Sequence, residues 1–566
     1  MQFLHDSVTR QANLRPDAPC IVFRGECITY SQLETASNQL ARLLRAHGCC
    51  EGERVCILMP KCPAAIISMI GILKAGCLYV PVDIANPAAR ISQIFDSCEN
   101  RWILAAGSVV PLLNELLAGE HPRPQISVAW LGVAKPTGAR FNPSFSLREL
   151  GLASKEPLPR GASGDASHVL FTSGSTGTAK GVVITHSNVR AFVDWALAHF
   201  GIDHTDRFSG CTPFHFDLST FDIFGTLAAG AQLHLVPPED MLPAKLANFI
   251  RISELTQWFS VPSILTFMTK FGAVKDNDFP ALRRVLWCGE VLPTPTLIHW
   301  MQKLPRTRFT NLYGPTEATI ASSYFDVPEC PQDPRNPVPI GLACGGEELL
   351  VLNDQLVPEA EGEIGDLYIG GAGLSPGYWR DPQKTAAAFI PDPRNPDSGR
   401  LLYRTGDLAR RDKNGIFHFV GRSDTQIKSR GYRIELGEIE TALNSLDQLE
   451  ECAVVAIQTE SFGGYMICCA YSAMHFSEFN LEALRKDLAR LVPNYMQPVR
   501  WMPYDVLPKN ANGKIDRPLL KKRFLERESA AGGHPSAPTL KPEVDSAHSA
   551  LCERANGEGS AAATRA

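Results

Sequence analysis

The sequence has no apolar run of about 18 residues, the length that a helix needs to cross a bilayer. It begins with the polar and acidic stretch MQFLHD rather than with a basic segment followed by an apolar one, so we expect no secretory signal. Neither sign of charge is in large excess, since the formal net charge is −5 over 566 residues. We therefore expect no nucleic-acid partner, no membrane partner and a cytoplasmic location.

Cysteine is present 16 times, but the sequence lacks the repeated C-x-x-C spacing with nearby histidines that is typical of a zinc site. The cysteines are scattered along the chain, and some are adjacent, as at 49–50 and 468–469. We interpret most of them as small side chains of the core and none of them as a metal ligand.

The pattern of the first 423 residues predicts an α/β fold. Helical periodicity at 36–44 and 64–73 alternates with a β-branched run at 54–58, as in parallel α/β layers. Charged and polar residues then become dense at 422–431, and a new pattern follows, helical at 439–446 and extended at 452–457. We predict an N-terminal domain at 1–423, a small α+β domain at 424–524 and a disordered tail at 525–566, which has few large apolar residues.

Residues 170–181 read LFTSGSTGTAKG and favour phosphate binding. Glycines allow successive backbone N–H groups to point into one concavity, and the hydroxyls and Lys180 add further donors. The run is not a Walker P-loop, because Lys180 lies between Ala179 and Gly181. Taken alone, such a run is more often a polar surface loop or linker than a phosphate-binding loop. The other motifs of the chain are needed to distinguish the two.

Seven further motifs accompany this run in a fixed order. They are LKAGCLYVPVD at 73–83, FDLS at 216–219, NLYGPTE at 311–317, GEIGDL at 362–367, YRTGD at 403–407, a long motif at 421–440 and NGKID at 512–516. Over about residues 1–520 the set resembles the adenylate-forming (AMP-binding) superfamily, specifically the amino-acid adenylation domains of nonribosomal peptide synthesis. The resemblance implies a large N-terminal domain of layered sheets and helices and a small, mobile α+β C-terminal domain.

The resemblance also implies ATP and Mg²⁺ as cofactors. A carboxylate that attacks the α-phosphate of ATP meets an anionic group, so the site must neutralise charge and align the reactants. Thr316 would bind the α-phosphate, and Glu317 would hold Mg²⁺, a hard cation that prefers anionic oxygen ligands. The alternative for Glu317 is a solvated surface acid. The predicted phosphate ligands are Thr172, Ser173, Gly174, Ser175, Thr176, Gly177 and Lys180.

Three more residues are predicted to contact the nucleotide. Asp407 matches the family's ribose ligand, because one carboxylate can accept hydrogen bonds from both sugar hydroxyls. Arg422 belongs to the same nucleotide-binding set, and Tyr313 would stack near the adenine, although an aromatic residue there could equally belong to the core.

An α-amino acid carries an ammonium and a carboxylate, and a buried charge without a partner is costly. Asp217 matches the family position that pairs with the ammonium, and Lys514 the position that bridges the substrate carboxylate and the nucleotide. The alternative for Asp217 is a helix-capping aspartate beside Ser219.

The pocket for the substrate side chain is predicted by alignment to the family. It carries no charge, which excludes acidic and basic amino acids and favours a small or compact neutral one: proline first, alanine or cysteine next. The set is most similar to that of prolyl-carrier ligases, and a one-residue slip near Phe259 would change it. Its members are Leu218, Phe221, Phe259, Leu286, Cys288, Leu312, Ile320 and Ala321.

The second step implied by the resemblance is transfer to the phosphopantetheine thiol of a carrier protein. The small domain would rotate about the hinge residue Asp424, withdraw Lys514 and bring in a hairpin that contains Lys428 and Gly431. The alternative for this segment is a plain charged linker. The tail is too short for a carrier domain, so we expect a free-standing ligase that uses a free amino acid and a separate carrier.

Two other protein classes remain open. An acyl- or aryl-CoA ligase would share the fold but would use free coenzyme A and would not require Asp217. A catalytically inactive interaction protein should have lost Lys514, Glu317 or Asp407, and all three are present. The sequence does not show whether Asp217 and Lys514 face one cavity.

Overall fold

The computed structural model describes residues 3–118, 126–159, 164–174, 179–458, 464–474, 479–510 and 514–530. Contacts divide the chain into two units, Met1–Ile515 and Asp516–Ala566. In the second unit the described part is helix α15, Arg517–Ala530, which continues past residue 524, where we expected the small domain to end. The rest of the predicted tail lies outside the described residues, and the domain boundaries at 423/424 and 524/525 stay predictions.

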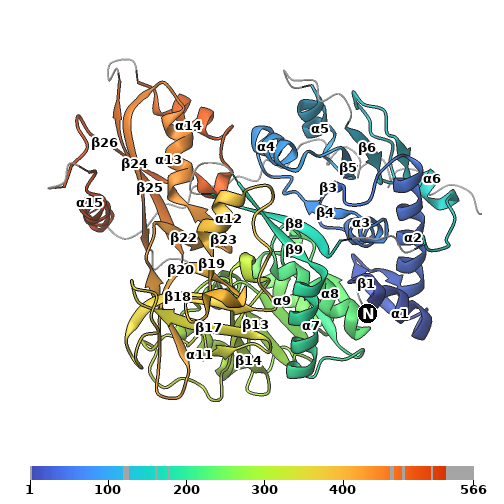
Figure 1. The fold of residues 1–566 in the computed structure, drawn as a ribbon, viewed down its shortest axis with the longest axis horizontal. Helices are drawn as coiled ribbons and strands as arrows, with labels where there is room; N and C mark the ends of the chain where they lie inside the picture. The colour runs from blue at the N-terminus through green and yellow to red at the C-terminus, as the bar shows by residue number, and fades with distance from the viewer. Residues whose placement is uncertain are drawn as a thin grey trace, which may run out of the picture. The chain divides into compact units, whose positions relative to one another are not determined.

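The first unit is a mixed α/β structure, as predicted (Figure 1). Its largest sheet, within the described residues, has the strand order β16-β15-β14-β13-β12-β10-β11-β1-β2. The strands from β14 to β1 run parallel, and those outside them pair antiparallel. The bounds are β1 Pro19–Phe23, β2 Glu26–Thr29, β10 Arg207–Gly210, β11 Gln232–Leu235, β12 Gln257–Ser260, β13 Arg284–Trp287, β14 Arg308–Tyr313, β15 Ser323–Asp326 and β16 Leu342–Ala343.

A second large sheet has the order β7-β6-β5-β3-β4-β8-β9. Neighbouring strands pair parallel except for β8 and β9, which form an antiparallel pair with Thr172 opposite Lys180. The glycine-rich run therefore joins two strands, and its residues 175–178 lie outside the described part of the chain. The bounds are β3 Arg54–Leu58, β4 Leu78–Pro81, β5 Trp102–Ala105, β6 Ser127–Trp130, β7 Phe145–Ser146, β8 Ala166–Thr172 and β9 Lys180–Thr185.

Helices cover these sheets, and a single apolar core cluster includes side chains of both. Helix α8 is buried along most of its length, as its apolar sequence LSTFDIFGTLAA predicts, and it lies beside α7 (Figure 1). The bounds are α1 Asp6–Leu14, α2 Tyr30–Ala46, α3 Pro63–Lys74, α4 Ala88–Cys98, α5 Val110–Leu117, α6 Leu147–Leu152, α7 His186–Phe200, α8 Leu218–Ala229, α9 Pro243–Ile252, α10 Pro262–Lys270, α11 Thr294–Lys303 and α12 Pro382–Ala388, with short 3-10 turns η1 Pro238–Asp240, η2 Thr316–Ala318, η3 Pro396–Ser398 and η4 Asn494–Met496.

The later strands form smaller sheets, and the segment after residue 436 has an α+β pattern with an apolar core of its own. The hairpin β22–β23 precedes this segment in the sequence and contributes Ile427 and Ile434 to the same core. The bounds are β17 Glu347–Leu352, β18 Ile364–Gly371, β19 Phe389–Pro391, β20 Leu401–Arg411, β21 Phe417–Arg422, β22 Gln426–Ser429, β23 Tyr432–Glu435, α13 Leu436–Asn444, β24 Leu449–Gln458, β25 Tyr465–Ala473, α14 Leu481–Leu488 and β26 Arg500–Pro503.

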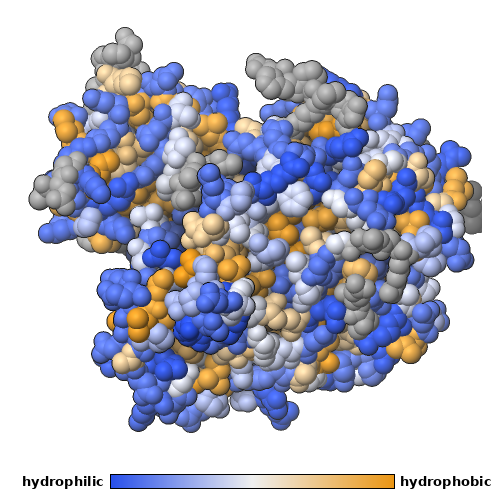
Figure 2. Space-filling view, in the orientation of Figure 1, coloured by the Kyte–Doolittle hydropathy of each residue, from blue (hydrophilic) through white to orange (hydrophobic). Residues whose placement is uncertain are grey.

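The expected elements are confirmed. The helical patterns at 36–44 and 64–73 lie in α2 and α3, the run at 54–58 is β3, and the pattern at 439–446 overlaps α13. Most cysteines of the described residues are buried, as expected of core side chains. Where side chains are described, no helix combines the length and apolar character needed to cross a bilayer. On the face drawn in Figure 2, hydrophilic and apolar residues are interspersed.

Candidate active site

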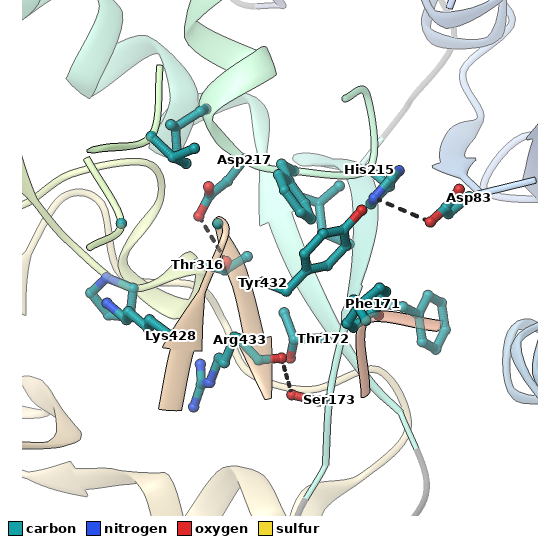
Figure 3. A pocket seen from close by; sticks show the side chains of 18 of the residues that line it. Asp83, Phe171, Thr172, Ser173, His215, Asp217, Thr316, Lys428, Tyr432 and Arg433 are labelled. Carbon is teal, nitrogen blue, oxygen red and sulfur yellow. Dashed lines mark hydrogen bonds and ion pairs between the residues drawn. The ribbon is translucent and has the colours of Figure 1, made fainter. Parts of the chain in front are cut away.

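A cavity of about 120 Å³ collects residues from most of the predicted motifs (Figure 3). Most of its walls come from residues at or just after the carboxyl ends of β4, β8, β10, β12, β13 and β14, the edge at which open α/β sheets bind ligands. The hairpin β22–β23 closes it from another direction. The lining includes Asp83, Thr172, Ser173, His215, Phe216, Asp217, Leu218, Val261, Gly314, Thr316, Asp407, Arg422, Lys428, Gly431, Tyr432 and Arg433.

Asp217 lies in this cavity at the start of α8. Its carboxylate accepts a hydrogen bond of 2.7 Å from the hydroxyl of Thr316 and makes no capping bond to the helix, so the capping alternative does not describe it. Burial raises the pKa of Asp217 to about 6, although Thr316 and the nearby Lys428 favour the ionised form. The hydrogen bond from Thr316 orients the carboxylate, which is ionised above about pH 6 and can then pair with a cation.

Glu317 is fully buried, which rules out the solvated-acid alternative. Arg433 donates to both of its carboxylate oxygens, at 2.9 and 2.7 Å, and the hydroxyl of Tyr378 donates at 2.9 Å. Burial opposes ionisation, but Arg433 and the hydrogen bonds outweigh it and lower the pKa of Glu317. An ionised carboxylate is a ligand that Mg²⁺ prefers, but in this structure Arg433 occupies both oxygens of Glu317, so the predicted role requires Arg433 to leave.

Asp407 has two partners in this structure. Arg422 donates to one carboxylate oxygen at 2.6 Å, and the hydroxyl of Tyr313 donates to the other at 2.5 Å. Arg422 also pairs with Asp424 at 2.6 Å, so it connects the predicted ribose ligand with the predicted hinge. The ring of Tyr313 is buried, and the amine of Lys428 lies 5.6 Å from its centroid.

The described part of the glycine-rich run contacts the hairpin and α13. The hydroxyl of Ser173 donates to the carbonyl of Arg433 at 2.6 Å, and the amide of Gly174 donates to Glu438 at 3.3 Å. Among the described residues the buried hydroxyl oxygen of Thr172 has no hydrogen-bond partner, which suits a ligand such as phosphate. Burial and the charge of Arg433 lower the pKa of Lys180. The predicted ligands Ser175, Thr176 and Gly177 lie outside the described residues.

Lys514 is not among the residues that line the cavity. Its side chain is exposed, and its backbone is bonded to Asn510 through an N–H bond of 3.1 Å and a carbonyl bond of 2.7 Å. Lys428 and Gly431 of the hairpin line the cavity instead. The structure therefore brings Asp217 together with the hairpin and not with Lys514, an arrangement that the resemblance assigns to the second step. The individual roles stay predictions.

The eight residues of the predicted side-chain pocket are all buried and belong to the large apolar core cluster, but of the eight only Leu218 lines the cavity. The rings of Phe221 and Phe259 meet edge to face with centroids 5.8 Å apart. Ile320 follows Thr319, and both have positive φ angles, 71° and 52°, which are strained for β-branched residues. The turn at Thr319 and Ile320 therefore helps, together with packing, to fix the position of Ile320 in the cluster.

Several polar residues at the site were not predicted, among them the cavity residues Asp83, His215, Tyr432 and Arg433 and the neighbouring Glu290 and Tyr378. Glu290 follows β13 at the carboxyl edge of the parallel sheet, which was the available signal. The sequence offered no comparable signal for the contact of Arg433 or Tyr378 with Glu317.

Comparison with known proteins places the chain in a family. The model of the AMP-binding enzyme family matches residues 8–379, and that of the AMP-binding enzyme C-terminal domain matches residues 438–514. The chain belongs to the AMP-binding enzyme family. Both the resemblance and the fold class predicted from the sequence are thereby confirmed.

Individual relatives agree with this assignment. Tyrocidine synthase 3 of Brevibacillus parabrevis is 32% identical over 521 residues, which are 92% of this chain but only 8% of that protein. The Vibrio cholerae adenylation domain AlmE, solved with glycyl-adenosine-5'-phosphate, has a TM-score of 0.79 and 25% identity, covering 93% of this chain and 98% of that one. Holo-PA1221, which contains adenylation and PCP domains, has a TM-score of 0.73 and 26% identity, covering 92% and 84%.

Proposed function

We propose that this protein activates a neutral α-amino acid with ATP and then transfers it to the phosphopantetheine thiol of a carrier protein. The observation that carries the proposal is Asp217, which lines the cavity beside Thr316 and is followed by Leu218, a cavity residue that belongs to the apolar core cluster. An amino acid would place its ammonium against Asp217 and its side chain against that cluster. A buried ammonium without such a partner would cost several kcal/mol.

In the first step a carboxylate oxygen of the amino acid attacks the α-phosphorus, and the bond to the pyrophosphate oxygen breaks. In the second step the thiol sulfur attacks the acyl carbon, gives up its proton, and AMP leaves. Thr316 would contact the α-phosphate, Asp407 would accept from the ribose hydroxyls, and Lys180 would hold the terminal phosphates. Glu317 would hold Mg²⁺, which when bound neutralises part of the phosphate charge.

In this structure two of these acids form ion pairs. Arg433 of the hairpin pairs with Glu317, and Arg422 at the end of β21 pairs with Asp407. ATP binding would have to exchange both partners for nucleotide contacts, and of the two arginines only Arg433 belongs to the hairpin. The first step therefore requires withdrawal of the hairpin, which would allow Lys514 to enter, and the second requires its return.

The substrate is a small or compact neutral amino acid, with proline the first choice and alanine or cysteine next. The support is the uncharged, fully buried cluster around Phe259 and Cys288, where a charged side chain would find no partner among the predicted pocket residues. The relative AlmE was solved with a glycyl adenylate, also derived from a small neutral amino acid.

Amino-acid-dependent exchange of labelled pyrophosphate into ATP tests this function. The panel is the twenty common amino acids, β-alanine and simple aryl acids. We expect one dominant signal from proline or a small neutral amino acid. A signal only from acids that lack an α-amine would overturn the proposal and favour an acyl- or aryl-CoA ligase that uses free coenzyme A.

The pKa of Asp217 predicts an acid limb in the pH profile. Because the pKa is raised to about 6, the carboxylate becomes protonated below that pH and loses its attraction for the ammonium. We expect kcat/KM for the amino acid to fall about tenfold per pH unit below pH 6. Circular dichroism at each pH controls for unfolding. A profile that is flat from pH 7 to pH 5 would contradict the prediction.

A further inference from the structure

Glu290 connects the hairpin to the large sheet. One of its carboxylate oxygens accepts a hydrogen bond of 3.0 Å from the amide of Ser263, at the N-terminus of α10. The other accepts a bond of 2.8 Å from the amide of Gly431, at the tip of the hairpin β22–β23. One side chain thus bonds to two backbone groups that are far apart in the sequence.

The hairpin tip fits closely against the wall of the cavity. Arg430 and Gly431 both have positive φ angles, 53° and 82°. A Cβ atom on Gly431 would lie 2.9 Å from Val261 and 3.3 Å from Phe216, so no side chain fits there. The next residue, Tyr432, meets the ring of Phe216 edge to face at 5.0 Å. The position of the tip is therefore specific, and Glu290 supplies its hydrogen bond to Gly431.

The bond from Ser263 orients the carboxylate of Glu290 independently of the hairpin. Its bond to Ser263 lies within the large domain, and a carboxylate is favoured at a helix N-terminus. Departure of the hairpin would leave Glu290 with that partner, while return of the hairpin would add a charge-assisted bond, which is stronger than a neutral one. Glu290 therefore favours the docked hairpin selectively.

We propose that Glu290 is a positioning residue for the thioester-forming step, which it serves by holding the hairpin tip at the cavity. The proposal rests on the two-step function above. Removal of one charge-assisted hydrogen bond lowers the equilibrium constant for docking of the hairpin by about tenfold or more.

The test compares the two half-reactions in Glu290→Ala. Transfer from chemically made prolyl-AMP, or the adenylate of the best exchange substrate, to pantetheine is measured beside pyrophosphate exchange. We expect the ratio of transfer rate to exchange rate to fall about tenfold, and Glu290→Gln to recover part of the loss, because its amide oxygen can still accept. An unchanged ratio would overturn the proposal. Equal falls in both rates would show that Glu290 has a merely structural role, and unchanged rates would show that it has no role in either step.

A second readout does not depend on activity. Hydrogen exchange of the segment 426–435, followed by mass spectrometry, should be faster in Glu290→Ala than in the wild type, and unchanged exchange would overturn the proposal. Glu149→Ala is the matched control, because Glu149 accepts from the amide of Ser146 at 2.9 Å within its own helix start. If no acid supports pyrophosphate exchange in the wild type, the proposed function fails, while hydrogen exchange still decides whether Glu290 holds the hairpin.

Discussion

Replacing Asp217 by asparagine is expected to lower proline-dependent pyrophosphate exchange, or exchange with the best substrate, by two to three orders of magnitude. Asparagine has the same shape, and its amide oxygen can still accept the 2.7 Å bond from Thr316, so the variant removes mainly the charge. The loss of one partner from a buried charge pair costs about 3–5 kcal/mol. Steady-state exchange at saturating ATP, with kcat/KM for the amino acid as the readout, measures this cost.

The matched control is a change of substrate rather than of protein. Cyclopentanecarboxylate has the ring of proline but no ammonium, so it gains nothing from the charge of Asp217. We expect Asp217→Asn to lose far less activity with this acid than with proline. Equal losses for both acids would contradict the pairing of Asp217 with the ammonium and would indicate that the variant disturbs the cavity as a whole.

The parts of the site that the sequence predicted were found through their match to family motifs. Asp217 and Thr316 follow strands β10 and β14 of the parallel sheet, whose carboxyl ends meet at one edge, whereas Asp407 lies on β20 of a smaller antiparallel sheet. The eight pocket residues were predicted by alignment to the family; all eight are buried in one cluster, but only Leu218 lines the cavity, so the pocket stays a prediction.

The contacts of the hairpin could not be predicted in the same way. Gly431 is 141 residues from Glu290, and Arg433 is 116 residues from Glu317, so no local pattern records either pair. They depend on where the small domain lies, and that position differs between the two steps of the proposed reaction. Sequence motifs indicate which residues belong to the site. Which of these residues bond to each other depends on packing between segments that are distant in the sequence.

Arg433 and the metal-bound nucleotide would compete for the carboxylate of Glu317. Glu317 is fully buried, so it needs a cationic partner at all times, and in this structure Arg433 is that partner. When the hairpin withdraws, another positive group must replace Arg433, because an isolated buried carboxylate is strongly destabilising. In the proposed reaction Mg²⁺ and Arg433 would therefore compete for Glu317, so the ATP-bound state and the docked-hairpin state would exclude each other, whereas the aminoacyl-adenylate would be bound in the docked-hairpin state.

Replacing Lys514 by alanine is expected to separate the two half-reactions. Lys514 is exposed, and the cavity is lined by Lys428 and Arg433 instead, so the docked-hairpin state should not need its amine. Adenylate formation should need it, because the resemblance places this lysine between the substrate carboxylate and the nucleotide. Loss of one such donor costs about two to three orders of magnitude in rate. We therefore expect pyrophosphate exchange to fall by that amount, while transfer from presynthesised aminoacyl-AMP to pantetheine falls less than about threefold.

Lys521→Ala is the control for loss of a lysine charge, because Lys521 is an exposed residue of α15. It should keep both rates. Equal loss of both half-reactions in Lys514→Ala would contradict a lysine that acts in only one state, since the turn around it would then matter for the structure. The opposite pattern, intact exchange with slow transfer, would place the amine in the second step. The expected split would instead mean that one cavity uses two sets of cations in turn, Lys514 for adenylation and the hairpin for transfer.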